Sequence, residues 1–333
     1  MNDRVLITGG AGFIGSHLVD YCLSQNHKIT VLDDFSSGSW KNLEEAKKSG
    51  DVRIIEGSIT NLNDVTKAYK DCHIAFHLAV QCVRRSLNRP FENHEINSTG
   101  TLNVLEGARQ KKIKRFIYCS SSEVYGNSRD SLLKEDTTVC EPVTIYGASK
   151  LAGEYYAKAY FRTYNLPTII VRPFNSYGPR EHAQGDLAEV IPRFVIRLLN
   201  NLSPVIFGSG QNGRDFTYIT DTVRGIYKAA YCDALIGREV NIAYGRMMTI
   251  DKVAKILAKV CQRMELEPIY RDPRPGDVHL LHADTNLAQT LLNFKADISF
   301  EEGLEKYVSW FKEHYPHPHV LLEEDVQNWC MPT

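Results

Sequence analysis

The chain lacks most features that would place it in a membrane, on a nucleic acid or around a metal. Its 333 residues contain no apolar run near the roughly 20 residues that a membrane-spanning helix needs. The formal net charge is −1, so no excess of Lys and Arg predicts binding to nucleic acid or anionic lipid. No Cys-x-x-Cys pair and no His, Cys or Asp cluster has the spacing of metal ligands. We therefore expect a globular protein without a metal site, whose partners are small molecules.

The cysteines carry no pairing signal either. The chain begins MNDRVLITGG, which passes directly into a strand pattern, so we expect no leader sequence. With 43% apolar residues it can build one large domain or two interleaved lobes. We expect a cytoplasmic protein whose thiols are free and mostly buried, at Cys22, Cys72, Cys82, Cys119, Cys140, Cys232, Cys261 and Cys330.

The sequence does have a glycine-rich turn near its start. Residues 5–23, VLITGGAGFIGSHLVDYCL, read as a strand, a turn and an amphipathic helix. Gly9 permits a tight turn, Gly12 lets the backbone approach a pyrophosphate, and Gly15 lets the helix pack against the strand. Phe13 and Ile14 complete the turn, and the following helix directs free N–H groups at the phosphates. This pattern predicts a dinucleotide site.

The second strand pattern, KITVLDDFSSG, indicates which dinucleotide binds. Asp33 ends this strand, eighteen residues after Gly15. A carboxylate there accepts hydrogen bonds from the adenosine ribose and repels a 2′-phosphate, which favours NAD over NADP. The alternative is that Asp33 and Asp34 only form a turn. Further strand patterns, VRIIEGSITN and HIAFHLAV, alternate with helices and predict an α/β Rossmann-type fold with a doubly wound parallel sheet.

Two later motifs contain groups suited to oxidising a hydroxyl. YCSSSEVYG (residues 118–126) contains Ser121, and YGASK contains Tyr146 and Lys150. A tyrosine with its ordinary pKa of about 10 is a poor base at neutral pH. Positive charge from Lys150, one helical turn away, and from a bound nicotinamide favours the phenolate. Ser121 can share the proton between substrate and Tyr146. The Tyr–Lys spacing alone is a common accident, but the glycine turn makes it a catalytic prediction.

Seven motifs in order support a family resemblance: TGGAGFIGSHL, HLAV, SSSEVYG, YGASK, RPFNSYGPR, RDFTYI and RPGD. Over about residues 3–312 the chain resembles the nucleotide-sugar epimerase and dehydratase branch of the extended short-chain dehydrogenase/reductase family. The resemblance implies a NAD-binding Rossmann domain over residues 1–175, with a returning segment near 212–245. It also implies a smaller interleaved nucleotide-sugar lobe formed by residues 176–211 and 246–333. UDP is the nucleotide that this family uses most.

The resemblance also implies roles for individual residues. Ser58, where the family usually has Asp, would contact adenine, and Ile59, Leu78 and Ala79 would be further cofactor contacts. Ser122 and Asn175 would bind the substrate, as would Arg214 and Arg274 (phosphate), Asp277 (ribose) and Leu281. The two arginines could instead form surface ion pairs. Leu281, at the position that limits the sugar's C2 substituent, leaves glucose-type and N-acetylglucosamine-type substrates open.

Glu123 leaves the reaction open. Family 4,6-dehydratases and decarboxylases carry glutamate here, where it can take the C5 proton once C4 is a ketone, whereas simple epimerases carry a small or neutral residue. VLDDFSSG and RPGDVHLLHAD instead resemble UDP-glucose and UDP-N-acetylglucosamine 4-epimerases. Glu123 could also be structural and accept N–H bonds from a loop. We therefore expect a 4-epimerase, with a 4,6-dehydratase, a UDP-glucuronate decarboxylase and a non-catalytic NAD sensor as successively weaker alternatives.

Two helical patterns, at residues 96–109 and 146–164, have apolar side chains on more than one face of the helix. Because one buried face cannot cover so many large side chains, a homodimer through these helices is expected. The side chains concerned are Leu151, Tyr155, Tyr156, Tyr160 and Phe161.

Overall fold

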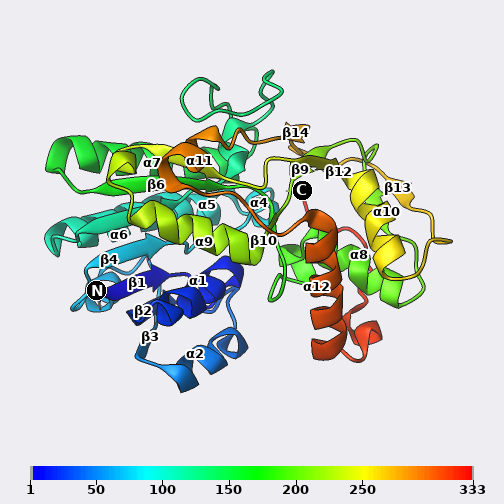
Figure 1. Ribbon diagram of the computed structural model, residues 1–333, viewed down its shortest axis with the longest axis horizontal. Helices are drawn as coiled ribbons and strands as arrows, with labels where there is room; N and C mark the ends of the chain where they lie inside the picture. Colours follow the sequence, from blue (N-terminus) through cyan, green and yellow to red (C-terminus); the bar gives the residue numbers. More distant parts are fainter. Residues whose placement is uncertain (1–2, 332–333) are drawn as a thin grey trace.

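The computed structural model describes residues 3–331 and contains a seven-stranded sheet. Figure 1 shows this sheet with helices packed around it. All neighbouring strands are parallel, in the order β11-β6-β5-β4-β1-β2-β3. The order reverses between β1 and β4, where such folds bind ligands. The expected doubly wound sheet is confirmed. Its strands are β1 (Arg4–Thr8), β2 (Lys28–Asp33), β3 (Val52–Glu56), β4 (Ile74–His77), β5 (Arg115–Cys119), β6 (Thr168–Pro173) and β11 (Glu239–Ile242).

Alternation along the strands explains the two helical layers. Val5 and Ile7 of β1 face a core shared with α1 (Phe13–Ser24) and α9 (Ile219–Ala230). Leu6 faces the opposite core, which contains α3 (Leu62–Ala68), α6 (Gly100–Gln110) and part of α7. Successive side chains of a strand point to opposite faces, so a strand that is apolar throughout needs cover on both sides. The remaining helices of this region are α2 (Glu44–Ser49), α4 (Val83–Ser86), α5 (Pro90–His94) and α7 (Ile145–Tyr164).

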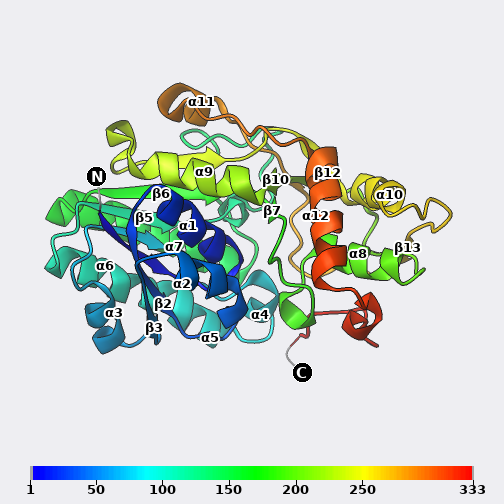
Figure 2. The ribbon, with the colours of Figure 1, turned by 60° about the horizontal axis from the view of Figure 1, so that its bottom comes forward.

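A second lobe lies beyond the carboxyl ends of the strands (Figure 2). Its helices are α8 (Val190–Leu199), α10 (Ile250–Val260) and α12 (Phe300–His314). Its small sheets pair β8 (Val205–Phe207) with β13 (Ile269–Arg271), β7 (Ser176–Tyr177) with β10 (Thr217–Tyr218), and β9 (Gly213–Asp215) with both β12 (Met247–Thr249) and β14 (Leu280–Leu281). The lobe therefore takes its elements from separate stretches of the chain.

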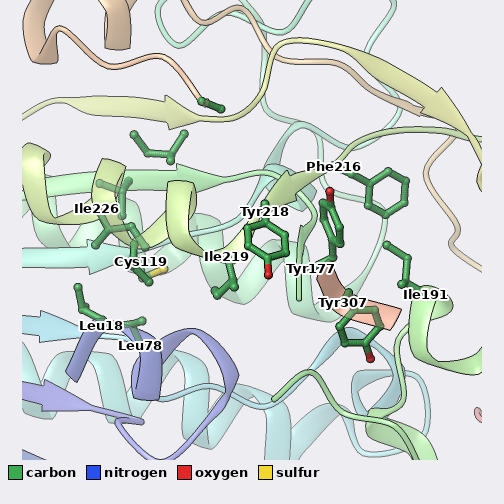
Figure 3. Packing of buried hydrophobic residues seen from close by; sticks show 14 of the residues in the cluster. Leu18, Leu78, Cys119, Tyr177, Ile191, Phe216, Tyr218, Ile219, Ile226 and Tyr307 are labelled. Atoms are coloured by element: carbon green, nitrogen blue, oxygen red, sulfur yellow. The ribbon is translucent and has the colours of Figure 1, made fainter. Parts of the chain in front are cut away.

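The chain passes between the lobes more than once. After β10 it returns to the large sheet as α9 and β11, and α11 (Asn286–Leu292) later packs on both. One hydrophobic core continues from α1 through Tyr177 and Tyr218 to α12, as Figure 3 shows around Leu18, Ile219 and Tyr307. The shared core fixes the position of the lobe over the edge of the sheet.

All eight cysteines are free thiols, and Cys22, Cys72, Cys119 and Cys261 are buried. Among residues 3–331, no helix combines the length and the apolar character that crossing a bilayer requires. The same residues contain no group of three or more His, Cys, Asp or Glu side chains arranged to hold a metal ion.

Candidate active site

A cavity of about 420 Å³ follows the carboxyl edge of the sheet, between the two lobes. The ends of β1, β2, β4, β5 and β6 all contribute to its wall. Many of the predicted site residues line this one cavity, namely Gly9, Gly12, Phe13, Ile14, Gly15, Asp33, Ile59, Leu78, Ala79, Ser121, Ser122, Glu123, Tyr146, Lys150 and Asn175. The structure thus brings together residues that lie up to 166 positions apart in the sequence.

The glycine turn at one end of the cavity has no room for a side chain at Gly9 or at Gly15. Gly9 has a φ of +69°, and a Cβ there would lie 2.6 Å from the backbone nitrogen of Ala79. A Cβ on Gly15 would collide with the carbonyl oxygen of Gly9. At Gly12 the nearest atom would be that same oxygen, at 3.3 Å, so this side of the turn is open. A tight turn with one open face before α1 fits the pyrophosphate of a dinucleotide.

Asp33 is held rigidly at the end of β2. Its Oδ2 accepts a hydrogen bond from the backbone of Ala11 (2.8 Å), and its Oδ1 accepts one from the backbone of Phe35 (2.9 Å). Burial raises the pKa of Asp33, and these two backbone bonds partly oppose that effect. The second lone pair of each oxygen is left for ribose hydroxyls. The residues present at this end of the cavity therefore fit NAD.

Ser58 lies beside the cavity without lining it. Its neighbours Gly57 and Ile59 contribute to the wall, but the Ser58 hydroxyl is 2.9 Å from the Thr60 hydroxyl and also accepts from the Thr60 backbone. These two bonds leave one hydrogen-bonding position of the hydroxyl free, and the adenine contact expected of Ser58 stays a prediction.

Tyr146 and Ser121 form the hydroxyl pair expected from the sequence. Thr144 caps α7, accepting a hydrogen bond from the backbone of Gly147 (3.0 Å), and so places Tyr146 in the first turn. Burial raises the pKa of Tyr146, while a hydrogen bond with the Ser121 side chain lowers it. Ser121 Oγ also accepts from the Glu123 backbone (3.2 Å), which orients the hydroxyl. The pair can accept and relay a proton inside the cavity.

Lys150 lies one turn further along α7 and is buried. Its Nζ donates a hydrogen bond to the carbonyl oxygen of Cys119 (2.8 Å) and lies 5.2 Å from the centre of the Tyr118 ring. Burial lowers the pKa of Lys150 to about 8. The ammonium group is therefore still largely protonated near neutral pH, so it supplies a positive charge on the cavity wall.

The two histidines near the glycine turn have structural partners. His77 lies between the hydroxyls of Thr8 (2.7 Å) and Thr101 (2.9 Å), and burial lowers its pKa to about 3. His17 contacts the carbonyl oxygen of Pro179 (2.8 Å), and burial lowers its pKa to about 4. Both rings are neutral at physiological pH, and both are engaged in packing contacts.

Glu123 has a buried oxygen without a partner. Its Oε2 makes no hydrogen bond to any described residue, and the same holds for Oδ1 of Asn175 and Oε1 of Gln81. All three residues line the cavity. Burial raises the pKa of Glu123, whereas the charges of Arg214 and Arg274 lower it. Three buried acceptors around one cavity indicate a ligand rich in donors, such as a sugar.

The residues that were predicted to bind phosphate and ribose form a separate cluster near Glu123. Asp277 accepts hydrogen bonds from Arg214 (2.9 Å), Arg274 (2.6 Å) and Asn212 (2.6 Å). Burial acts to raise the pKa of Asp277, but the two arginines outweigh it and hold the pKa below its usual value. None of these three residues lines the cavity, namely Arg214, Arg274 and Asp277. The positive charges of the two arginines nevertheless lower the pKa of Glu123, which does line it.

Leu281 occupies a different environment from the one expected. The side chain has no exposed surface and packs with Val124, Phe174 and Val278 in a small core cluster. It is not part of the cavity wall, whereas Phe174 is. Any effect of Leu281 on the sugar's C2 substituent would therefore be transmitted through its neighbours.

Several wall residues were missed from the sequence. Gln81 and Cys82 lie in the loop that follows β4, four and five residues after His77, so the rule that ligands bind beyond the ends of parallel strands could have found them. Other wall residues have no pattern that points to the cavity, among them Arg85 on α4, Leu187 in a short 3-10 helix, and His182 and Glu189 on either side of that helix.

Comparisons with known proteins agree with this geometry. The profile of the family described as NAD dependent epimerase/dehydratase matches residues 5–243. UDP-glucose 4-epimerase from Mycolicibacterium smegmatis is 33% identical over 313 residues, which are 93% of this chain and 98% of that protein. UDP-N-acetyl-alpha-D-glucosaminuronate decarboxylase from Bacillus cytotoxicus is 32% identical over 329 residues, which are 94% and 99% of the two chains. The structure of DesIV, a dTDP-glucose 4,6-dehydratase from Streptomyces venezuelae with NAD and TYD bound, superposes with a TM-score of 0.89 at 29% identity, and covers 96% of this chain and 100% of that one.

Proposed function

Because this chain belongs to the NAD dependent epimerase/dehydratase family, we propose that it is an NAD-dependent 4-epimerase of a UDP-hexose or a UDP-N-acetylhexosamine. The observation that carries the proposal is the Ser121–Tyr146 hydroxyl pair, which shares one cavity with the glycine turn and Asp33. The named UDP-glucose 4-epimerase among the relatives supports the choice of reaction and nucleotide.

The residues of the chain divide the chemistry among them. NAD, when bound, accepts a hydride from the sugar carbon and returns it. Tyr146 takes the proton of the sugar's C4 hydroxyl, and Ser121 relays it. Lys150 lies one helical turn from Tyr146, and a nearby cation favours the phenolate form of a tyrosine. Burial and the charge of Glu123 act in the opposite direction, because both raise the pKa of Tyr146.

The other end of the cavity would hold the nucleotide. Asn175, with an unpartnered buried oxygen, and the two arginines of the Asp277 cluster are suited to the diphosphate and ribose. For Arg214 and Arg274 to bind phosphate directly, they must share Asp277 with the ligand or release it. Their charges act on Glu123, so an anionic diphosphate near them would be stabilised.

A second candidate is a nucleotide-sugar 4,6-dehydratase. The observation that favours it is the buried and unpartnered Oε2 of Glu123 in the cavity wall. A structural carboxylate would be expected to accept N–H bonds from its loop, and none is made to this oxygen by the described residues. Burial raises the pKa of Glu123, which makes its carboxylate a stronger base for a C5 proton.

Incubation with several UDP sugars distinguishes the candidates. The purified protein is mixed with UDP-glucose, UDP-N-acetylglucosamine and UDP-glucuronate in the presence of NAD, and products are read by NMR and by mass. The proposal predicts an axial–equatorial exchange at C4 without a change of mass. Loss of one water would indicate the dehydratase, and loss of carbon dioxide would indicate a decarboxylase. Binding of NAD without any conversion would contradict an enzymatic function and favour a sensor.

A further inference from the structure

The C-terminal segment after α12 folds back onto the second lobe. In Figure 2 this segment, residues 316–331, lies beside α8 and α12. Trp329 is buried, and its ring meets the ring of Phe207 of β8 edge-on, with centroids 4.4 Å apart. Leu321 is buried as well, in a short 3-10 helix that packs on α8. These two apolar anchors fix the segment, which we call the tail, to the lobe.

Three polar contacts of the tail converge on one short stretch of the chain, while another joins the Val326 carbonyl oxygen to Arg193 of α8. Glu323 Oε1 accepts a hydrogen bond from the backbone nitrogen of Gly185 (2.5 Å). Asn328 Nδ2 donates to the carbonyl oxygens of Ala188 (2.9 Å) and Gly185 (3.3 Å). Gly185 has a φ of +67°, and residues 185–187 form only one short 3-10 turn, closed by a backbone bond from the Ala188 nitrogen to the Gly185 carbonyl oxygen (3.1 Å). The tail thus supplies partners to both ends of residues 185–188.

That stretch also forms part of the cavity wall. Leu187 and Glu189 line the cavity, and α8 begins at the next residue. On the side facing the Rossmann domain, Arg84 donates to the carbonyl oxygens of Asp186 (2.7 Å) and Leu187 (2.6 Å) and pairs with Glu189 (2.9 Å). Residues 185–189, here named the bridge, are therefore held by Arg84 from one lobe and by the tail from the other.

We propose that the tail is a positioning element for the nucleotide-sugar half of the cavity, with Glu323 and Asn328 as its positioning residues. An irregular segment that must become ordered when ligand binds loses conformational entropy at that moment and weakens binding. The tail orders the bridge beforehand. This inference rests on the proposed function, because it assumes that the wall formed by Leu187 and Glu189 meets a nucleotide sugar. The glycine turn and Asp33 belong to other elements, so NAD binding should not depend on the tail.

The test uses the full chain with Glu323→Ala and Asn328→Ala combined. Glu324→Ala, which removes the adjacent exposed carboxylate, is the matched control. The single variant Glu323→Gln keeps an acceptor oxygen, so it should bind the nucleotide sugar as the unaltered protein does. UDP and one converted UDP sugar are titrated by calorimetry, NAD affinity is measured separately, and hydrogen exchange follows residues 185–189. Loss of the two side chains removes three hydrogen bonds to the bridge and should raise the Kd and KM for the nucleotide sugar roughly tenfold. The kcat and the NAD affinity should stay within about twofold of the control, and the bridge should exchange faster.

Unchanged nucleotide-sugar affinity in the double variant would overturn the inference. So would an equal loss of NAD affinity, because that result indicates a general loss of structure. Failure of the unaltered protein to bind UDP or any UDP sugar is a different outcome: it removes the proposed function, and this inference with it. Ending the chain after Tyr315 is less informative, since it also removes Trp329 and Leu321 from the core of the lobe.

Discussion

Tyr146 is the residue on which the proposed chemistry depends most. Tyr146→Phe removes one oxygen and leaves the ring that packs at the start of α7, so the fold and NAD binding should persist. We expect kcat to fall by a factor on the order of 10² or more, because a positioned proton-transfer group is lost. Tyr155→Phe is the matched control: it lies on the same helix and is 63% exposed, so its activity should equal that of the unaltered protein.

Retention of most activity in Tyr146→Phe would contradict the assignment. So would a larger loss in a His77→Gln variant that still folds, since His77 is neutral and engaged by Thr8 and Thr101.

Asp33 should decide the choice between NAD and NADP. Asp33→Asn keeps the shape of the side chain but removes the charge that repels a 2′-phosphate. The ratio of NADP to NAD affinity, measured by titration of the apo protein, should rise by about tenfold or more, the scale of a charge-assisted hydrogen bond replaced by a neutral one. Asp51→Asn is the control, because this carboxylate is exposed and pairs with Lys28. Equal affinity of the unaltered protein for both cofactors would count against the role of Asp33.

At the scale of single residues, the sequence predicted the position of those residues that belong to a local motif. The glycine turn follows β1 and Asp33 ends β2, with α1 between them. Because β1, α1 and β2 form one continuous unit, the spacing of these residues was enough to predict that they line the same cavity. Leu281 depended on packing between distant segments, which carries no local pattern, so its burial against Phe174 was not foreseen. The unpartnered oxygen of Glu123 could not be predicted from the sequence either, because it depends on which groups surround the side chain in the folded structure.

Among the elements, α7 matters most for catalysis, since it carries both Tyr146 and Lys150. Thr144→Ala removes the cap at its start and should lower the free energy of unfolding by about 1 kcal/mol. Because Tyr146 lies in the first turn, fraying there should also lower kcat. Ser299→Ala removes the corresponding cap of α12, which is bound to the Glu302 backbone. It should lower stability by a similar amount, measured by urea unfolding, and leave kcat within about twofold. Equal kcat in the two variants would contradict the coupling between cap and catalysis.

Elements with a strong periodic pattern were predicted well, and irregular ones were not. The strands at residues 4–8, 28–33, 52–56 and 74–77 are short apolar runs followed by turns, and all four pair in the sheet. The bridge has no periodicity, and its position depends on Arg84 and on the tail, which lie about 100 residues before it and 140 residues after it. Contacts of such long range leave no trace in a single sequence.

We expect two copies of the chain to form a homodimer, with α7 and the adjacent helices at the interface. Of the five large side chains singled out on α7, Tyr155 is exposed, while the other four are partly covered by their own chain. Phe91, on the adjacent α5, is 89% exposed, so an apolar surface remains. Light scattering should give twice the chain mass of 37.8 kDa. Tyr155→Glu should give the monomer, and Met264→Glu, 71% exposed on the other lobe, should not. A monomeric unaltered protein would refute the dimer.

The division into two lobes was expected only from the family resemblance, and its bounds stay a prediction. No change of composition marks residue 175, and the chain crosses between lobes at β10, after β11 and again at α11. The core that joins them contains Tyr177 and Tyr218, whose contacts form only when both lobes are folded. Sequence patterns therefore identified the end of the cavity that fits NAD better than the opposite end, where we propose that the nucleotide sugar binds.

The most direct test of the epimerase assignment is the reaction in D₂O, followed by NMR of the product sugar. Epimerisation at C4 never breaks the bond between C5 and its hydrogen, whereas dehydration removes the C5 proton and replaces it from solvent. We predict a C4 epimer of unchanged mass without deuterium on any carbon, and Glu123→Gln should retain activity within a factor of about ten, because the Ser121–Tyr146 pair is intact. Deuterium at C5 together with loss of one water, abolished in Glu123→Gln, would contradict the epimerase and identify Glu123 as the base of a dehydratase.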